Sequence, residues 1–298
     1  MNVRPYLRRF FLFALLAGAV LPVAAFGSDD SVVAVLSSDS GPYRQAFDGF
    51  QKAFGREVHV YSLSEGEPKI PPETRVIVAF GGKAALYPYQ PGPLLIYCLA
   101  PGTKIKAGEH RGGLLKIHTS PNVYMTLSKF KDLQPTLKRL AVIWAGDSIK
   151  DYVAQKKDMA DRTGIEMLSD RVLNPDDLPN HLRALKGKID AIWLPPDAFI
   201  VTPKNFATIK AFSLANNIPF YVPSNALVEQ GGTASANCSF EEIGELVAQM
   251  VPQALSGSLT TDNVFPSLLH FSVNLSAAKT DNLKIPPELL KQADLVVP

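Results

Sequence analysis

The chain has 298 residues, with 30 basic and 28 acidic side chains and no extended run of lysine or arginine. A nearly neutral chain of this kind lacks the electrostatic footprint of a protein that binds nucleic acid or anionic lipid. Its length exceeds what one hydrophobic core usually serves, so we expect two lobes.

The first 27 residues have the pattern of a secretory signal peptide. Three arginines precede an apolar stretch at 10–23, and small residues follow at Ala24, Ala25 and Gly27. The apolar stretch is short for a membrane span, which needs about 20 residues. We therefore expect cleavage and export to the periplasm, with an uncleaved N-terminal anchor as the alternative. Removal of the leader leaves 27 basic and 28 acidic residues.

After the leader, strand-like and helix-like stretches alternate in two consecutive sets. Several strand-like stretches are apolar and β-branched throughout, as in strands that helices cover on both faces. The expected strands lie at 31–38, 57–63, 75–82, 93–101, 139–146, 165–173, 190–196 and 218–224. The expected helices lie at 43–55, from 83 onward, and at 122–133, 149–163, 178–185 and 203–216. This alternation predicts an α/β fold with two doubly wound lobes and parallel sheets.

One carboxylate, Asp197, follows the apolar strand and its two prolines in "AIWLPPDAFIV" (191–201). Prolines end a strand because they donate no ladder hydrogen bond. Open parallel sheets bind ligands beyond the carboxyl ends of their strands. Asp197 is therefore interpreted either as a ligand contact at this rim or as a cap for the turn before Phe199.

Polar groups follow two strands of the first set. "LSSDSGPY" places Ser38, Asp39 and Tyr43 beside a helix start, where such groups bind a ligand or cap the helix. In "AFGGKAAL", Gly82 and Lys83 open a helix, and free backbone amides beside a lysine suit a carboxylate or another anion.

In the second set, "WAGDS" contains Trp144 and Asp147. Asp147 is expected to cap the next helix or to touch a ligand. Trp144 is interpreted either as an apolar wall of the site or as core, and Trp193, inside another strand pattern, is expected in the core.

The sequence contains no recognisable catalytic or metal-binding pattern. Its five histidines lack metal-ligand spacing, and no nucleophile elbow or dinucleotide-binding glycine motif follows a strand. We therefore expect a binding protein rather than an enzyme, with no metal or cofactor. Cys98 and Cys238 are expected to be two separate buried thiols, with a disulfide between them as the alternative.

Several segments together resemble the ABC-transporter substrate-binding proteins of the tryptophan/tyrosine-binding type. They include "VAVLSSDSGPYRQAFDGF", "FGGKAA", "LKRLAVIWAGDS", "SVNLSAAKTDNLKIPPELLKQAD" and the long segment from "AIWLPPDAFIV" to "SANCSFEEIG". The resemblance covers nearly the whole chain after the leader. It implies the type I periplasmic-binding-protein fold, in which two Rossmann-like lobes are joined by three crossovers and a small ligand is delivered to a membrane permease.

The implied topology divides the chain into a first lobe (28–115 plus 238–262) and a second lobe (116–237 plus 263–298). It also implies a ligand-binding set at the cleft: Ser38, Asp39, Tyr43, Gly82, Lys83, Ala100, Trp144, Asp147, Asp197, Asn225 and Asn237.

The chain departs from the family pattern at three places. Lys83 follows Gly82 where a threonine or serine is common, "CLAPG" replaces a "TDP"-like turn, and no acid lies at or directly beside Ser239. These changes favour an anionic ligand, with Lys83 on its carboxylate and Asp197 on an amine or hydroxyl. We expect a monomer that closes on an amino acid, possibly aromatic, or another small carboxylate. The alternative is a sensory module that docks on a membrane kinase or chemoreceptor.

Overall fold

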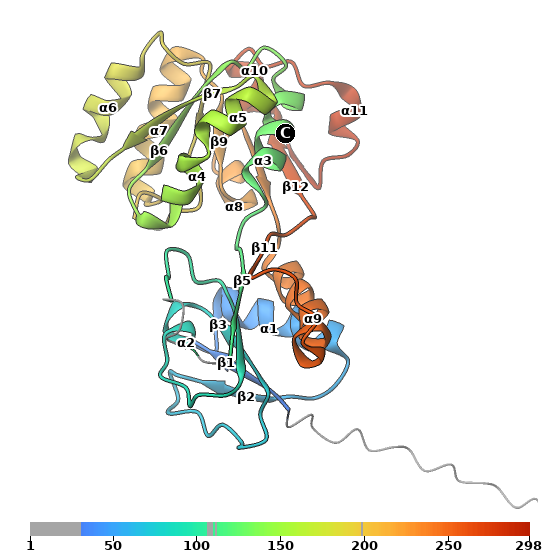
Figure 1. Cartoon of the computed structure of the whole chain (residues 1–298). Coiled ribbons are helices and arrows are strands. Elements are labelled where there is room, and N and C mark those ends of the chain that lie inside the picture. Colours follow the sequence, from blue (N-terminus) through green and yellow to red (C-terminus); the bar gives the residue numbers. More distant parts are fainter. Residues whose placement is uncertain (1–30, 106–109, 111, 198) are drawn as a thin grey trace, which may run out of the picture.

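Two lobes joined by three chain segments make up the computed structural model, which describes residues 31–105, 110, 112–197 and 199–298 (Figure 1). Each lobe has its own sheet with helices packed against it, and neither sheet shares a strand with the other. The two-lobed α/β class expected from the alternating pattern is confirmed.

The first lobe contains, within the described residues, a six-stranded sheet in the order β11-β5-β4-β3-β1-β2, and all its neighbouring strands are parallel. The central strands are built from valine, isoleucine and other apolar residues and are buried on both faces. The strands are β1 (Val32–Leu36), β2 (His59–Ser62), β3 (Val76–Phe80), β4 (Leu94–Cys98), β5 (Leu114–Ile117) and β11 (Asn263–Val264).

The helices α1 (Gly41–Phe54) and α9 (Phe240–Ser256) pack closely against each other on this sheet, although 185 residues of chain lie between the end of α1 and the start of α9. The helix α2 (Gly82–Ala85) is a single turn after β3. Their crossing depends on two glycines. A Cβ on Gly244 would lie 1.8 Å from the carbonyl oxygen of Ala46, and one on Gly49 would lie 2.2 Å from that of Glu241. Backbone atoms fill both positions, so no side chain can be added unless the helices separate.

Replacing Gly244 with alanine is therefore expected to destabilise the first lobe by about 3 kcal/mol, since overpacking strains a close-packed contact. Urea unfolding measures this change, and Gln253→Ala, an exposed position of the same helix, serves as the control. Equal stability of both variants would contradict the close helix crossing.

The second lobe contains, in the part of the chain described, a seven-stranded sheet in the order β13-β12-β10-β9-β8-β6-β7. Its pairs are parallel except β10 with β12. The strands are β6 (Arg139–Trp144), β7 (Glu166–Arg171), β8 (Ala191–Trp193), β9 (Phe220–Val222), β10 (Ala234–Asn237), β12 (His270–Asn274) and β13 (Leu295–Val297).

Helices cover both faces of this second sheet (Figure 1). They are α3 (Val123–Leu133), α4 (Lys150–Ala154), α5 (Lys156–Thr163), α6 (Leu178–Leu185), α7 (Pro203–Asn216), α8 (Asn225–Glu229), α10 (Leu275–Thr280) and α11 (Pro287–Leu290). The single helix expected at 149–163 is wrong: a 3₁₀ turn (Asp147–Ile149) precedes two short helices, α4 and α5.

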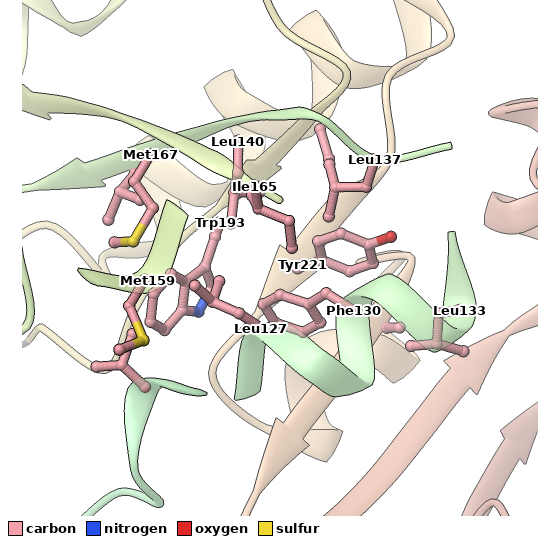
Figure 2. Packing of buried hydrophobic residues seen from close by; sticks show 14 of the residues in the cluster. Leu127, Phe130, Leu133, Leu137, Leu140, Met159, Ile165, Met167, Trp193 and Tyr221 are labelled. Carbon is pink, nitrogen blue, oxygen red and sulfur yellow. The ribbon is translucent and has the colours of Figure 1, made fainter. Parts of the chain in front are cut away.

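Aromatic rings organise the core between α3 and the sheet (Figure 2). The Phe130 ring stacks on Tyr221 with centroids 4.1 Å apart, and it meets the Trp193 ring edge-on at 5.8 Å. The Tyr221 hydroxyl donates to Oε1 of Gln134 at 2.9 Å, which satisfies its buried polar atom. This packing fixes the side chain of Trp193, the last residue of β8.

Three crossovers connect the lobes: 118–122 between β5 and α3, 238–239 between β10 and α9, and 265–269 between β11 and β12. Because Asn263 and Val264 pair with β5, they lie with the first sheet, and the sequence-based boundary at 263 is a few residues early.

Candidate functional site

The carboxyl ends of the strands in both lobes face a shared cleft. A small cavity of about 70 Å³ shows this directly, because residues following β4, β5 and β8 line it together with Ile149, which follows β6. Its lining residues are Tyr97, Ala100, Pro101, Gly102, Lys116, Ile117, His118, Thr119, Ser120, Ile149 and Pro196.

A larger cavity, about 330 Å³, adjoins the small one and shares with it Thr119, Ser120 and Pro196. This volume is within the range of small-molecule sites. The first lobe contributes Gln45 and Phe240, and the crossovers and the second lobe contribute the rest. Those are Thr119, Ser120, Pro121, Thr126, Trp193, Pro196, Pro223, Ser224, Asn225, Ala226, Ala236, Asn237, Cys238 and Ser239.

The two lobes present an aromatic ring each to this larger cavity. Trp193 is 4% exposed and forms its inner wall, whereas Phe240, the first residue of α9, is 36% exposed. The capping box of Ser239 and Glu242 fixes the helix start, since each side chain accepts a hydrogen bond from the other residue's backbone N–H. The position of Phe240, which lies between them, is therefore fixed by the helix start, and its partly exposed side chain lines the cavity.

Two asparagines of the second lobe, Asn225 and Asn237, lie side by side in the cavity wall. The Asn225 carboxamide oxygen accepts from the hydroxyls of Ser235 and Ser272, at 3.1 and 2.9 Å, and from Nδ2 of Asn237 at 3.2 Å. These three bonds fix the orientation of the Asn225 amide.

Three of the residues expected at the site from the sequence therefore line a cavity: Ala100, Asn225 and Asn237. Direct contact of these residues with a ligand stays a prediction. The other expected residues line neither cavity in this structure.

Asp197 is the clearest correction to the ligand-contact interpretation. Its side chain is 0% exposed, and one carboxylate oxygen accepts from the backbone N–H groups of Ala145 and Gly146, both at 2.7 Å. The other oxygen accepts from the N–H of Phe199 at 3.0 Å. Asp197 therefore connects the turn after β8 to the turn after β6. Its bond to the Phe199 N–H agrees with the alternative interpretation, a cap for the turn before Phe199.

The residues after β1 and β3 also find partners within the first lobe. Asp39 forms an ion pair with Arg44 at 2.9 Å, and Tyr43 packs against the core of that lobe. The hydroxyl of Ser37, not of Ser38, accepts from the N–H of Ala84 at 3.0 Å and so occupies one amide of α2. Gly82 and the exposed Lys83 stand at this turn, away from both cavities.

Trp144 and Asp147 are likewise engaged outside the cavities. The Trp144 indole is buried in the core, and its N–H donates to the Ser169 hydroxyl at 2.9 Å. Asp147 is exposed and pairs with Arg171 at 3.0 Å. The interpretation of Trp144 as an apolar wall of the site is thus replaced by the core alternative.

Sequence reasoning missed the aromatic residues of the cavity, although their positions carried a signal. Trp193 ends a buried strand two residues before the prolines, and Phe240 opens a helix directly after a crossover. Strand ends and crossovers are where the two lobes meet, so large apolar residues there were candidates for the walls.

The crossovers contact one another at the hinge. The Cys238 thiol donates to the carbonyl of Thr119 at 3.3 Å, which joins the second crossover to the first. The His118 ring stacks on Phe265 with centroids 3.8 Å apart, which joins the first to the third. Both cysteines are free thiols, as expected, and burial raises the pKa of Cys238 to about 12, so it is protonated at neutral pH.

One polar bridge spans the lobes beside the hinge. His270 of β12 hydrogen-bonds Asp294 of its own lobe and Glu242 of α9 in the first lobe. The hydrogen bonds to Asp294 and to Glu242 raise the pKa of His270 above its ordinary value. The protonated imidazole thus holds two carboxylates from two lobes.

Over the described ranges, no three histidine, cysteine or acidic side chains gather as a metal site would require. In the same part of the chain no helix combines the length and apolar character needed to cross a membrane.

The fold resembles that of solved type I binding proteins. A domain from Streptococcus pneumonia in complex with L-Trp has a TM-score of 0.61 at 20% identity, with 89% of this chain and 99% of that chain covered. A ligand-free, open substrate-binding protein with adhesive properties from Clostridium difficile has a TM-score of 0.66 at 15% identity, with 89% and 98% covered. These similarities define the fold class as the two-lobed α/β architecture of such proteins.

The family follows from the sequence model for "ABC transporter substrate binding protein", which matches residues 119–297. The chain therefore belongs to this family. It is also 24% identical over 139 residues to a tyrosine-binding protein of Clostridioides difficile (strain R20291), which is 46% of this chain. That match spans 40% of the relative's own length.

Replacing Asp197 with asparagine is expected to destabilise the protein by about 3 kcal/mol, because an amide N–H₂ then faces a buried backbone donor. Chemical unfolding measures the change. The matched control is Asp147→Asn, whose exposed ion pair contributes about 1 kcal/mol or less. A stable Asp197→Asn protein that has lost ligand binding would instead restore Asp197 as a ligand contact.

The bridge at His270 predicts a pH dependence. Because the pKa of His270 is raised on folding, its contribution to stability is complete below the unfolded pKa of about 6.5 and is lost as pH rises through the folded pKa. Because His270 is partly exposed, solvent screening limits its contribution to the unfolding free energy to about 1 kcal/mol or less. Unfolding free energies measured from pH 5.5 to 8.5 should fall less steeply for His270→Gln than for the parent. Gln253→Ala, an exposed position of α9 without a titratable group, should keep the parent slope. Identical slopes for all three proteins would contradict the bridge.

Proposed function

We propose that this protein is an exported solute-binding protein that captures a small molecule between its lobes and delivers it to an ABC importer. The proposal includes a cleaved leader at residues 1–27, a periplasmic location, a monomeric state and the absence of catalytic activity. In this proposal each lobe moves as one body, and the three crossovers are the hinge.

The observation that carries the proposal is the larger cavity itself. Residues of both lobes and of the crossovers line it, so a guest there is within reach of Trp193 from the second lobe and Phe240 from the first. A ligand that contacts both lobes favours the conformation in which the contacts are complete, and closure follows from that differential affinity.

Separate cores support movement at the hinge. The apolar clusters of the first lobe and those of the second have no residue in common. Rotation about the crossovers therefore leaves both cores intact, as in hinge closure of two domains around a ligand.

The relatives support a ring-bearing ligand. The L-Trp complex and the tyrosine-binding protein share the fold and part of the sequence, respectively. The aromatic walls of the larger cavity suit a flat ring, since aromatic pairs stack or meet edge-on at favourable energy. Lys83 and Asp197, expected to hold a carboxylate and an amine, do not line this cavity.

A thermal-shift screen of amino acids, small carboxylates and nucleobases tests the proposal. A true ligand at 100-fold over its Kd should add about 2.7 kcal/mol of stability and reduce the radius of gyration in X-ray scattering. Phe240→Ala should weaken binding about tenfold by removing the first-lobe ring. Leu214→Ala, on the outer face of α7, should bind normally. Binding without compaction, insensitive to Phe240, would contradict a site between the lobes.

A further inference from the structure

The paired carboxamides of Asn225 and Asn237 leave one amide nitrogen and one carbonyl oxygen without a partner among the residues that the structure describes. Both N–H groups of Asn237 Nδ2 are used, on Asn225 Oδ1 and on the Ser235 hydroxyl, each at 3.2 Å. The Asn225 oxygen receives three donors. This leaves Nδ2 of Asn225 and Oδ1 of Asn237 outside the network.

These two remaining atoms belong to residues that line the larger cavity. Neither belongs to the buried side-chain atoms that lack a partner among the described residues, so both are accessible, and both residues line the larger cavity. The mutual bond consumes one donor and one acceptor whichever way round the two amides are turned. The pair therefore always offers a guest one N–H donor next to one carbonyl acceptor.

The same cavity is uncharged. None of the described residues that line it is an aspartate, glutamate, lysine, arginine or histidine. Charged groups are costly to remove from water unless they are paired. An α-amino acid zwitterion would bring two charges into this cavity without a counter-charge from its walls, whereas a neutral guest would bring none.

The remaining walls suit a flat ring. Trp193 and Phe240 approach from the two lobes, and Pro121, Pro196 and Pro223 add rigid apolar surface. A planar guest between such walls presents its edge to the asparagine pair.

We infer that the cavity selects a neutral, planar heterocycle that carries an adjacent N–H and C=O on one edge, the lactam or imide edge of a nucleobase-type ring. The ring N–H donates to Oδ1 of Asn237, and the ring carbonyl accepts from Nδ2 of Asn225. This inference rests on the proposed function and names its substrate class; it replaces the small carboxylate expected from the sequence.

Calorimetric titration of the unmodified protein provides the first test. The probes are uracil and xanthine, which have the edge, 1,3-dimethyluracil, in which methyl groups replace the N–H donors, and zwitterionic tryptophan and tyrosine. Uracil or xanthine should bind at least about tenfold more tightly than the methylated ring and the amino acids, because loss of the paired edge leaves polar atoms unsatisfied.

A matched pair of variants provides the second test. Asn225→Asp keeps the inward acceptor for Ser235 and Ser272 and replaces the outward donor by an acceptor, so uracil or xanthine should bind about tenfold more weakly or worse. Asn180→Asp makes the same change on the exposed surface of α6 and should bind as the parent does.

The outcomes separate the two proposals. Tight binding of tryptophan or tyrosine, with no loss of affinity in Asn225→Asp, would overturn the neutral heterocycle as the ligand. It would leave the proposed solute-binding function intact. If the unmodified protein bound uracil and 1,3-dimethyluracil equally tightly, the role of the N–H and C=O edge would be overturned. This outcome does not depend on whether the Asn225→Asp variant folds. No binding of any probe, and no hit in the wider thermal-shift screen, would overturn the proposed function as well.

Discussion

The three crossovers are the constraint on which the rest of the structure depends. They are the covalent links between two sheets with separate cores, and they place the carboxyl ends of both sets of strands on opposite sides of one cleft. Contacts among the crossovers, such as His118 on Phe265 and the Cys238 thiol on Thr119, keep them together. The cavity lies at this junction because strand ends and crossovers meet there.

The buried carboxylate of Asp197 shows how the second lobe shapes its side of the cleft. Its three backbone hydrogen bonds join the turns after β6 and β8, next to Pro196, which lines both cavities. A buried carboxylate is stable only where donors compensate for lost hydration, and here backbone amides do so. Asp197 thus fixes the turn that ends in this part of the cavity wall.

Much of the fold was accessible from the sequence because its signals are local. The helices at 178–185 and 203–216 were predicted at their observed bounds, since a proline lies in the first turn of each and Thr202 caps the second. The site was less accessible. Whether Asp197 faces a ligand or a neighbouring turn depends on Ala145 and Gly146, some fifty positions earlier. Asn225 and Asn237 were found through the topology that the family resemblance implies, whereas their mutual hydrogen bond and the facing Phe240 are products of tertiary packing.

The two tryptophans allow the central claim, that the guest lies in the cavity between Trp193 and Phe240, to be measured directly. The chain has two tryptophans, and the second, Trp144, is buried away from the cavity. In a Trp144→Phe protein, emission arises from Trp193 alone, and ligand should change it in a saturable way with the Kd found by calorimetry. Saturation of the calorimetric signal with unchanged Trp193 emission would place the ligand elsewhere and contradict the account.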